Sequence, residues 1–341
     1  MRIAPARCAL GCSRIWTSAT KASRHSAAAA AASSHAQPRG PARSPRRAAV
    51  RCAAMAPPAP EQVSANKQYG GWNRRYKHAS SALGCDMTFT VYSPPAAEAG
   101  GKVPVVWWLS GLTCTDENVI QKSGAQRGCA RHGIAFVAPD TSPRGLGVEG
   151  EADSWDFGVG AGFYINATVD KWRNWRMYDY ITQELPALLA AHFPKLDTGN
   201  TSIMGHSMGG HGALTIALKN PGAFKAVSAF APICNPVNVP WGQKAFSGYL
   251  GDADKEGWKQ HDASELLAAY KGPKFPLLVD TGSGDSFLQR ELRPEALEAA
   301  AARSGFPLTS RMQDGYDHSY FFISTFMDEH IDFHAAALKA E

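Results

Sequence analysis

The sequence predicts an α/β protein with a mostly parallel central sheet and helices on both faces. Apolar strand-like runs alternate with helical segments from about residue 87 to the end, which is typical of repeated β–α units. The runs 103–109 and 134–138 are apolar throughout, as expected for strands buried on both faces. The glycine-flanked turn around Ser207 joins a strand-like run to a helical one. No internal repeat is evident, so we expect a single domain over residues 61–341.

The first elements of this domain are predicted from local patterns. Residues 87–92 alternate between apolar and polar side chains, which predicts an edge strand at an antiparallel start of the sheet. The buried strand 103–109 follows. Thr115 is suited to begin a helix that reaches about Arg131, and the second buried strand, 134–138, comes next.

The later elements continue the alternation after an irregular stretch. Residues 141–172 are rich in glycine and aromatic side chains and lack periodicity, and loops of this length inside a domain are usually functional. Apolar residues at three- and four-residue spacing predict a helix over 178–189. The remaining predicted elements are, in order, a strand at 201–204, a helix at 213–218, a strand at 226–231, an insertion to about 274, a strand at 275–279, a helix at 294–303, a strand at 308–312 and a closing helix at 319–338.

The chain has a net charge of +5 because its first 60 residues are strongly basic. This segment holds ten Lys and Arg and no acidic residue, and Glu61 is the first carboxylate of the chain. The remaining residues hold 25 basic and 30 acidic side chains. The predicted domain therefore lacks the excess of positive charge that is typical of nucleic-acid-binding proteins. No apolar run approaches the length of a membrane span, and we expect neither nucleic acid nor membrane as a partner.

Residues 1–60 have the composition of a leader. They are rich in Ala, Ser and Arg, with a run of alanines at 27–32, and they lack the continuous apolar core of a secretory signal. This composition predicts a disordered transit peptide for a chloroplast or mitochondrion. A plain disordered extension and initiation at Met55 stay open as alternatives, and the latter would leave the protein in the cytoplasm.

Cysteine usage favours a reducing compartment and no metal. Three of the seven cysteines lie in the leader, and the predicted domain holds Cys85, Cys114, Cys129 and Cys234. No pair of them has the short spacing of a zinc or redox site. Nothing in the pattern requires a disulfide, so we expect most of these cysteines to pack in the core.

The stretch Gly205-His206-Ser207-Met208-Gly209 reads as the nucleophile elbow of an α/β-hydrolase fold. The glycines permit a sharp turn that exposes the serine hydroxyl between a strand and a helix. A serine hydroxyl is a weak nucleophile at neutral pH, so it needs a base, and the base needs an orienting carboxylate.

These partners follow the elbow in the order that the fold requires, acid before histidine. Asp285 comes directly after the predicted strand 275–279 and its loop, and His318 follows the strand 308–312. Asp280 is a second candidate for the acid, although its place at the strand end suits a structural role better. The other histidines after the elbow are His211, His261, His330 and His334, and their positions in helices or in the polar insertion favour packing roles.

The tetrahedral intermediate of such a reaction needs two donors for its oxyanion. We expect one to be the backbone N–H of Met208, directly after the nucleophile, and the other to be the N–H of Leu112 in the loop after strand 103–109. Cys114 lies close to this loop, so modification of its thiol could block the site. It is not expected to be the nucleophile, because the motif order supplies no base for it.

Several stretches together resemble the S-formylglutathione hydrolases, also called esterase D. The matching segments are 108–116, 143–145, 153–164, 205–214, 284–288 and 315–320. The resemblance covers about residues 64–339. It implies hydrolysis of S-formylglutathione to glutathione and formate in formaldehyde detoxification, without a cofactor or metal. It also implies a triad of Ser207, Asp285 and His318, with oxyanion donors at Leu112 and Met208.

The chain departs from the usual pattern of this family in two places. Members are commonly cytosolic, whereas this chain carries the basic leader, and Thr281-Gly282-Ser283-Gly284 stands where an Asp-Gln-Gly-like segment often precedes the acid.

The alternative functions are a broad short-chain carboxylesterase, an acyltransferase with the same triad and a non-catalytic relic. The mode of glutathione binding and the oligomeric state, with a homodimer as one alternative, are not readable from the sequence.

Overall fold

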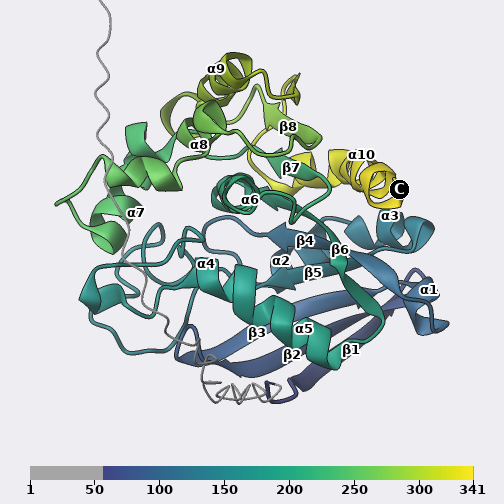
Figure 1. The fold of residues 1–341 in the computed structure, drawn as a ribbon. Coiled ribbons are helices and arrows are strands. Elements are labelled where there is room, and N and C mark those ends of the chain that lie inside the picture. The colour runs from purple at the N-terminus through teal and green to yellow at the C-terminus, as the bar shows by residue number, and fades with distance from the viewer. Residues whose placement is uncertain (1–56, 341) are drawn as a thin grey trace, which may run out of the picture. The chain divides into compact units, whose positions relative to one another are not determined.

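A computed structural model of the protein describes residues 57–340 and places nine strands in one sheet, in the order β1-β2-β3-β5-β4-β6-β7-β8-β9 (Figure 1). β1, β2, β3 and β5 pair antiparallel in turn, and every pair from β5 through β4 and β6 to β9 is parallel. The strands are β1 (Glu61–Gln68), β2 (Gly71–Ser80), β3 (Cys85–Ser93), β4 (Val103–Leu109), β5 (Ala135–Pro139), β6 (Leu196–His206), β7 (Val227–Phe230), β8 (Leu277–Gly282) and β9 (Leu308–Gln313). The predicted mostly parallel sheet is confirmed.

The prediction that residues 87–92 form an edge strand is wrong. They lie in β3, and β2 and then β1 extend the sheet beyond it. Nearly all of β1 is exposed, and much of β2 is charged, so neither shows the hydrophobic alternation that marks a strand in sequence. Backbone pairing builds both strands: β2 pairs with β3, from Trp72 opposite Ser93 to Ser80 opposite Cys85, and β1 pairs with β2.

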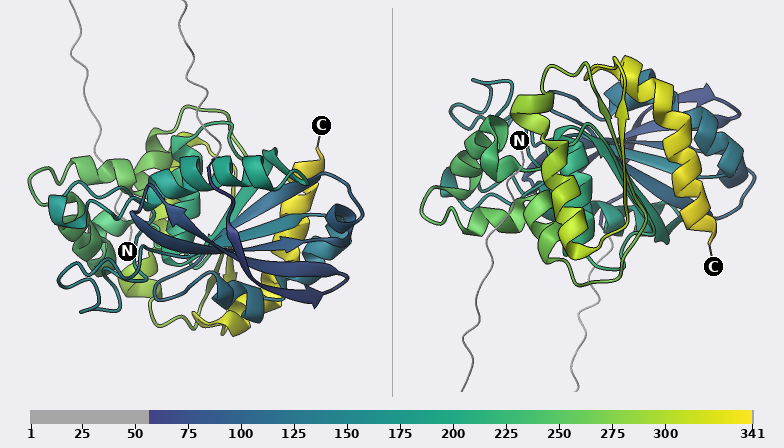
Figure 2. Two further views of the ribbon diagram at one scale, coloured as in Figure 1. Left: turned by 90° about the horizontal axis from the view of Figure 1, so that it is seen from below. Right: turned by 90° about the horizontal axis from the view of Figure 1, so that it is seen from above.

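Helices cover both faces of the sheet. α3 and α10 lie side by side on one face, and α5 and α6 pack on the other (Figures 1 and 2). The helices are α1 (Pro95–Glu98), α2 (Glu117–Lys122), α3 (Ala125–His132), α4 (Met177–Asp179), α5 (Leu185–His192), α6 (Met208–Lys219), α7 (Pro240–Leu250), α8 (Ala263–Ala269), α9 (Pro294–Ser304) and α10 (Tyr320–Lys339). Among residues 57–340, no helix is long and apolar enough to cross a membrane.

Two predicted helices are interrupted in the structure. The helix expected from Thr115 to Arg131 divides into α2 and α3 at Gly124, whose φ of +72° is left-handed. The helix expected over 178–189 becomes α4, a π-helical turn at Tyr180–Glu184, and α5. Pro186, which has no N–H to donate, is the second residue of α5, two positions after the π-helical turn ends.

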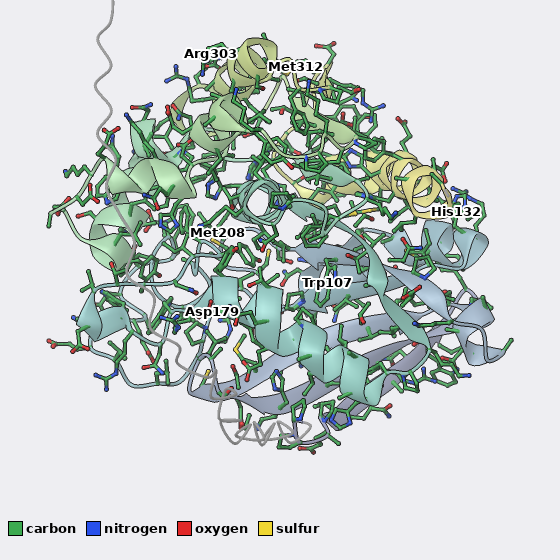
Figure 3. All side chains as sticks on the ribbon, in the orientation of Figure 1. Trp107, His132, Asp179, Met208, Arg303 and Met312 are labelled. Carbon is green, nitrogen blue, oxygen red and sulfur yellow. The ribbon has the colours of Figure 1, made fainter. Side chains whose placement is uncertain are left out.

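The core forms around β4 and β6, the central parallel strands. Trp108 is fully buried, and Trp107 and Met208 also lie in the interior of the molecule (Figure 3). Residues 141–172 form the predicted irregular excursion, with isolated bridges and one 3₁₀ turn at Asp170–Trp172. The predicted leader falls almost entirely in residues 1–56, which lie outside the described residues.

Candidate active site

Ser207 occupies a sharp turn between β6 and α6. Its φ of +56° and ψ of −119° are a strained combination for a residue with a side chain. The flanking glycines are required by close packing, because a Cβ on Gly209 would lie 2.0 Å from the Leu109 carbonyl oxygen. A Cβ on Gly205 would lie 2.3 Å from the Gly209 oxygen. The segment therefore has the geometry of a nucleophile elbow.

The two predicted partners of the serine meet at the same edge of the sheet. His318 Nδ1 lies 2.6 Å from Asp285 Oδ2, and the Asp285 side chain is fully buried. The second oxygen, Oδ1, accepts a hydrogen bond from the Phe287 N–H at 2.8 Å. Both carboxylate oxygens thus have a donor, and the bond to Nδ1 fixes the orientation of the imidazole and leaves Nε2 available to accept a proton.

The loops that carry Asp285 and His318 are joined through their backbones. The Gly284 N–H donates to the Tyr316 carbonyl at 2.9 Å, and the Ser283 N–H donates to the Gln313 carbonyl at 2.9 Å. A Cβ on Gly282 would lie 2.1 Å from the Tyr316 oxygen. The glycines of Thr281–Gly284 therefore allow the acid loop to approach the histidine loop closely.

Asp280, the second candidate for the acid, faces away from this site. It accepts two hydrogen bonds of 2.6 Å from Arg311, and His330 Nε2 lies 3.5 Å from its Oδ2. Burial opposes the ionisation of Asp280, but the nearby His330 and the bonds from Arg311 outweigh it and lower the pKa of Asp280. Asp280 is thus a structural ion-pair partner inside the fold.

The alternative histidines are held elsewhere by packing. His330 and His334 are buried, and one ring nitrogen of each lies 2.8 Å from the Ser228 hydroxyl. His211 is fully buried in α6, and its Nε2 donates to the His261 carbonyl oxygen at 2.8 Å. Of the histidines considered from the sequence, only His318 contacts a loop carboxylate beside Ser207.

Two rings enclose the His318 imidazole. The ring of His206, directly before Ser207, has its centroid 4.5 Å from that of His318, and Phe287 packs edge-on at 5.0 Å. Burial holds the pKa of His206 well below its usual range, and the neighbouring His318 lowers it further. His206 therefore stays neutral, and an imidazolium that forms on His318 meets an uncharged neighbour. The described residues show no hydrogen bond between Ser207 and His318, and such bonds are often long before substrate binds.

The predicted oxyanion loop approaches the nucleophile. A Cβ on Gly111 would lie 3.2 Å from Ser207 Cβ, a tight contact, so the glycine lets the loop come near without displacing its neighbours. Within residues 57–340, neither the Leu112 N–H nor the Met208 N–H donates to another protein group. The next residue, Thr113, has a φ of +68°, and its N–H donates to the Gly160 carbonyl at 2.9 Å.

Residues that sequence reasoning missed hold this loop in place. Arg144 donates to the Cys114 carbonyl at 3.1 Å while its guanidinium is paired with Asp140 at 2.8 Å. The hydroxyl of Tyr164 donates to the Ser110 carbonyl at 2.9 Å. Both residues lie in segments singled out from the sequence, but only the fold shows that they anchor the oxyanion loop.

The thiol of Cys114 has the properties of a group that does not act as a nucleophile. Burial raises the pKa of its thiol, although the adjacent Tyr320 hydroxyl and the charge of Lys122 oppose that effect. A thiol with a raised pKa is a poor nucleophile. In the described part of the chain, no group of three or more His, Cys, Asp or Glu side chains is arranged to hold a metal ion.

Comparisons with known proteins show the family of this chain. Residues 80–333 match the family described as "Putative esterase". The S-formylglutathione hydrolase of Arabidopsis thaliana is 58% identical over 278 residues, which cover 82% of this chain and 98% of that protein. The chain belongs to the S-formylglutathione hydrolase family. The family protein of Rattus norvegicus is 54% identical over 282 residues, which cover 82% of this chain and 99% of that one.

A solved family structure has the same fold. The S-formylglutathione hydrolase of Agrobacterium tumefaciens is 48% identical and superimposes with a TM-score of 0.78, over 81% of this chain and 99% of that one. The predicted α/β-hydrolase fold and the resemblance to the S-formylglutathione hydrolase family are thereby confirmed.

Proposed function

We propose that this chain hydrolyses S-formylglutathione to glutathione and formate, with Ser207 as the nucleophile. The hydrogen bond of 2.6 Å between His318 and Asp285, beside the strained serine elbow, carries the proposal. Relatives named for this activity match the chain at 54–58% identity over nearly their whole length.

The chemistry follows from the positions of these groups. His318, oriented by Asp285, takes the proton of Ser207 as the serine oxygen attacks the formyl carbon of the thioester. The N–H groups of Leu112 and Met208 stabilise the negative charge that develops on the carbonyl oxygen. The C–S bond breaks, and the proton on His318 passes to the leaving sulfur of glutathione. Water then enters, and His318 takes one of its protons as the water oxygen attacks the formyl carbon of the ester on Ser207. The bond between that carbon and the serine oxygen breaks, formate leaves, and His318 passes the proton from water to Ser207.

Substrate preference tests the proposed function. We expect a higher kcat/KM for S-formylglutathione than for a simple aryl acetate, because the thioester presents a small acyl group and a good leaving group. Ser207→Ala should lower kcat by about 10⁴-fold or more while the protein still unfolds at the wild-type temperature. An equal or reversed preference would instead indicate a broad carboxylesterase, and diversion of the acyl group to added alcohols would indicate an acyltransferase.

We also propose that residues 1–60 direct the protein to an organelle, where it would take part in formaldehyde catabolism. The basic, acid-free composition of this segment supports the proposal. Residues 1–60 fused to a fluorescent reporter should place the signal in chloroplasts or mitochondria. A reporter with residues 55–60 alone is the control, and a diffuse cytosolic signal from the full leader would overturn the proposal.

A further inference from the structure

A groove beside the catalytic histidine has a composition suited to an anionic ligand. Its cavity measures about 570 Å³, and it is lined by Lys122, Ser319, Tyr320, Phe321 and Ser324. This volume lies within the range of small-molecule sites. The groove adjoins the active site on two sides, because Ser319 follows His318 in the chain and α2, which carries Lys122, follows the oxyanion loop.

The cation in this groove has no carboxylate to neutralise it. Lys122 makes no ion pair with any residue in the range 57–340, and its ammonium lies 5.7 Å from the centre of the Tyr320 ring. Its charge acts on the thiol of Cys114, close to the oxyanion loop. The positive N-terminal end of α10, a helix of 20 residues, begins at the same groove and adds to the attraction for an anion.

The groove also presents an apolar surface that the fold does not cover. Phe321 is 84% exposed, directly after Tyr320 and at the first turn of α10. A large aromatic ring with this degree of exposure, next to a catalytic loop, is available for contact with the methylene groups of a ligand. An unpaired ammonium and an exposed ring together suit an amphipathic anion.

A second rim of the site is less suited to an amphipathic anion. An aromatic row runs outward from Phe287 through Trp241 to Trp155, and Lys244 lies beside its outer end. The ammonium of Lys244 is already bonded to the Asp156 carboxylate and to the Ser154 hydroxyl. Its charge is therefore compensated, unlike that of Lys122.

We propose that the glutathionyl part of the substrate lies in the groove formed by Lys122, Tyr320 and Phe321, with one of its carboxylates paired to Lys122. The proposal rests on the proposed function, since it names where that substrate is held. The leaving sulfur must lie near His318 to receive its proton, so the peptide begins at the edge of this groove. Glutathione carries two carboxylates and one ammonium, and its net negative charge complements Lys122.

Lys122→Met tests the proposal with two thioesters. For S-formylglutathione we expect about a tenfold loss in kcat/KM, carried by KM, because a charge-assisted bond to a carboxylate is removed. For S-formyl-N-acetylcysteamine, a neutral thioester with the same acyl group, the variant should match the wild type within about twofold. Lys122→Arg keeps the charge and should retain most of the wild-type kcat/KM.

Lys244→Met is the matched control, since it removes a lysine from the opposite rim. It should leave kcat/KM for S-formylglutathione within about twofold of the wild type. The proposal is overturned if Lys122→Met keeps the wild-type KM, if it impairs both thioesters equally, or if only Lys244→Met raises KM. Turnover of S-formylglutathione by the wild type is measured first, so a failure of the proposed function would be seen independently.

Discussion

Asp280 and Asp285 follow one another closely in sequence, yet they meet different partners. Asp285 orients His318 from a loop beyond β8, whereas Asp280 points from the strand itself to Arg311. Both carboxylates are fully buried, so burial alone does not separate them. The separation comes from the partner that each side chain reaches.

Matched asparagine variants should distinguish the orienting role of Asp285 from the structural role of Asp280. Asp285→Asn should lower kcat by about 10⁴-fold with little effect on stability, because the imidazole loses its orienting charge. Asp280→Asn should instead lower the free energy of unfolding by roughly 2–3 kcal/mol, because Arg311 loses its buried partner. Steady-state kinetics and urea unfolding of both variants measure the two effects. A loss of kcat in Asp280→Asn that equals that of Asp285→Asn would contradict the assignment.

At the scale of elements, the 141–172 excursion supports the oxyanion loop. The Gly160 carbonyl accepts the Thr113 N–H, and the rings of Phe157 and Tyr249 stack at 4.4 Å to fix the excursion against α7. The Tyr249 hydroxyl binds the same segment, since it accepts from the Gly158 N–H at 2.8 Å and donates to the Ala161 carbonyl at 2.9 Å. The middle of this irregular segment thus has a fixed conformation because it is bonded both to the oxyanion loop and to α7.

Two alanine variants test this support. Gly160 and Gly145 have φ values of +77° and +72°, so alanine at either position should cost about 1–2 kcal/mol of stability. Only at Gly160 would the new Cβ meet the oxyanion loop, at 3.1 Å from Thr113 Cα, while nothing lies within 4 Å at Gly145. We expect Gly160→Ala to lower kcat by about 10²-fold and Gly145→Ala to keep it. Similar kcat values for the two variants would show that the contact does not matter.

At the scale of the whole molecule, buried histidines link stability to pH. His211 and His334 are fully buried, and burial lowers the pKa of each to about 3. Their pKa in the unfolded chain is near 6.5, so below that pH the unfolded state binds protons that the folded state does not. The stabilisation is complete above pH 6.5 and is lost as the pH falls.

We therefore expect a marked loss of stability as the pH falls from about 6.5 to about 5. Each of the two histidines should contribute a slope of about 1.4 kcal/mol per pH unit once the pH lies below 6.5. Urea unfolding across this range measures the slope. His334→Gln should reduce the slope by the contribution of one histidine. A flat dependence of the unfolding free energy on pH would contradict this expectation.

The sequence by itself determined the elements with a local signature. The continuous apolar runs of β4 and β5 predict buried strands, because a strand with two covered faces needs apolar side chains on both. The elbow at Ser207 is also local, since its glycines, its strand and its helix are contiguous. The order of Ser207, Asp285 and His318 could be stated from the sequence because the fold fixes the order in which its strands end.

Tertiary structure decided what depends on contacts between distant segments. The polar strands β1 and β2 form by pairing their backbones, which leaves no hydrophobic pattern to detect. The choice between Asp280 and Asp285 depends on Arg311 and His318, which lie in or after β9. The groove at Lys122 joins two segments far apart in the chain. Such contacts involve residues whose spacing in sequence carries no periodicity, so only the folded chain brings them together.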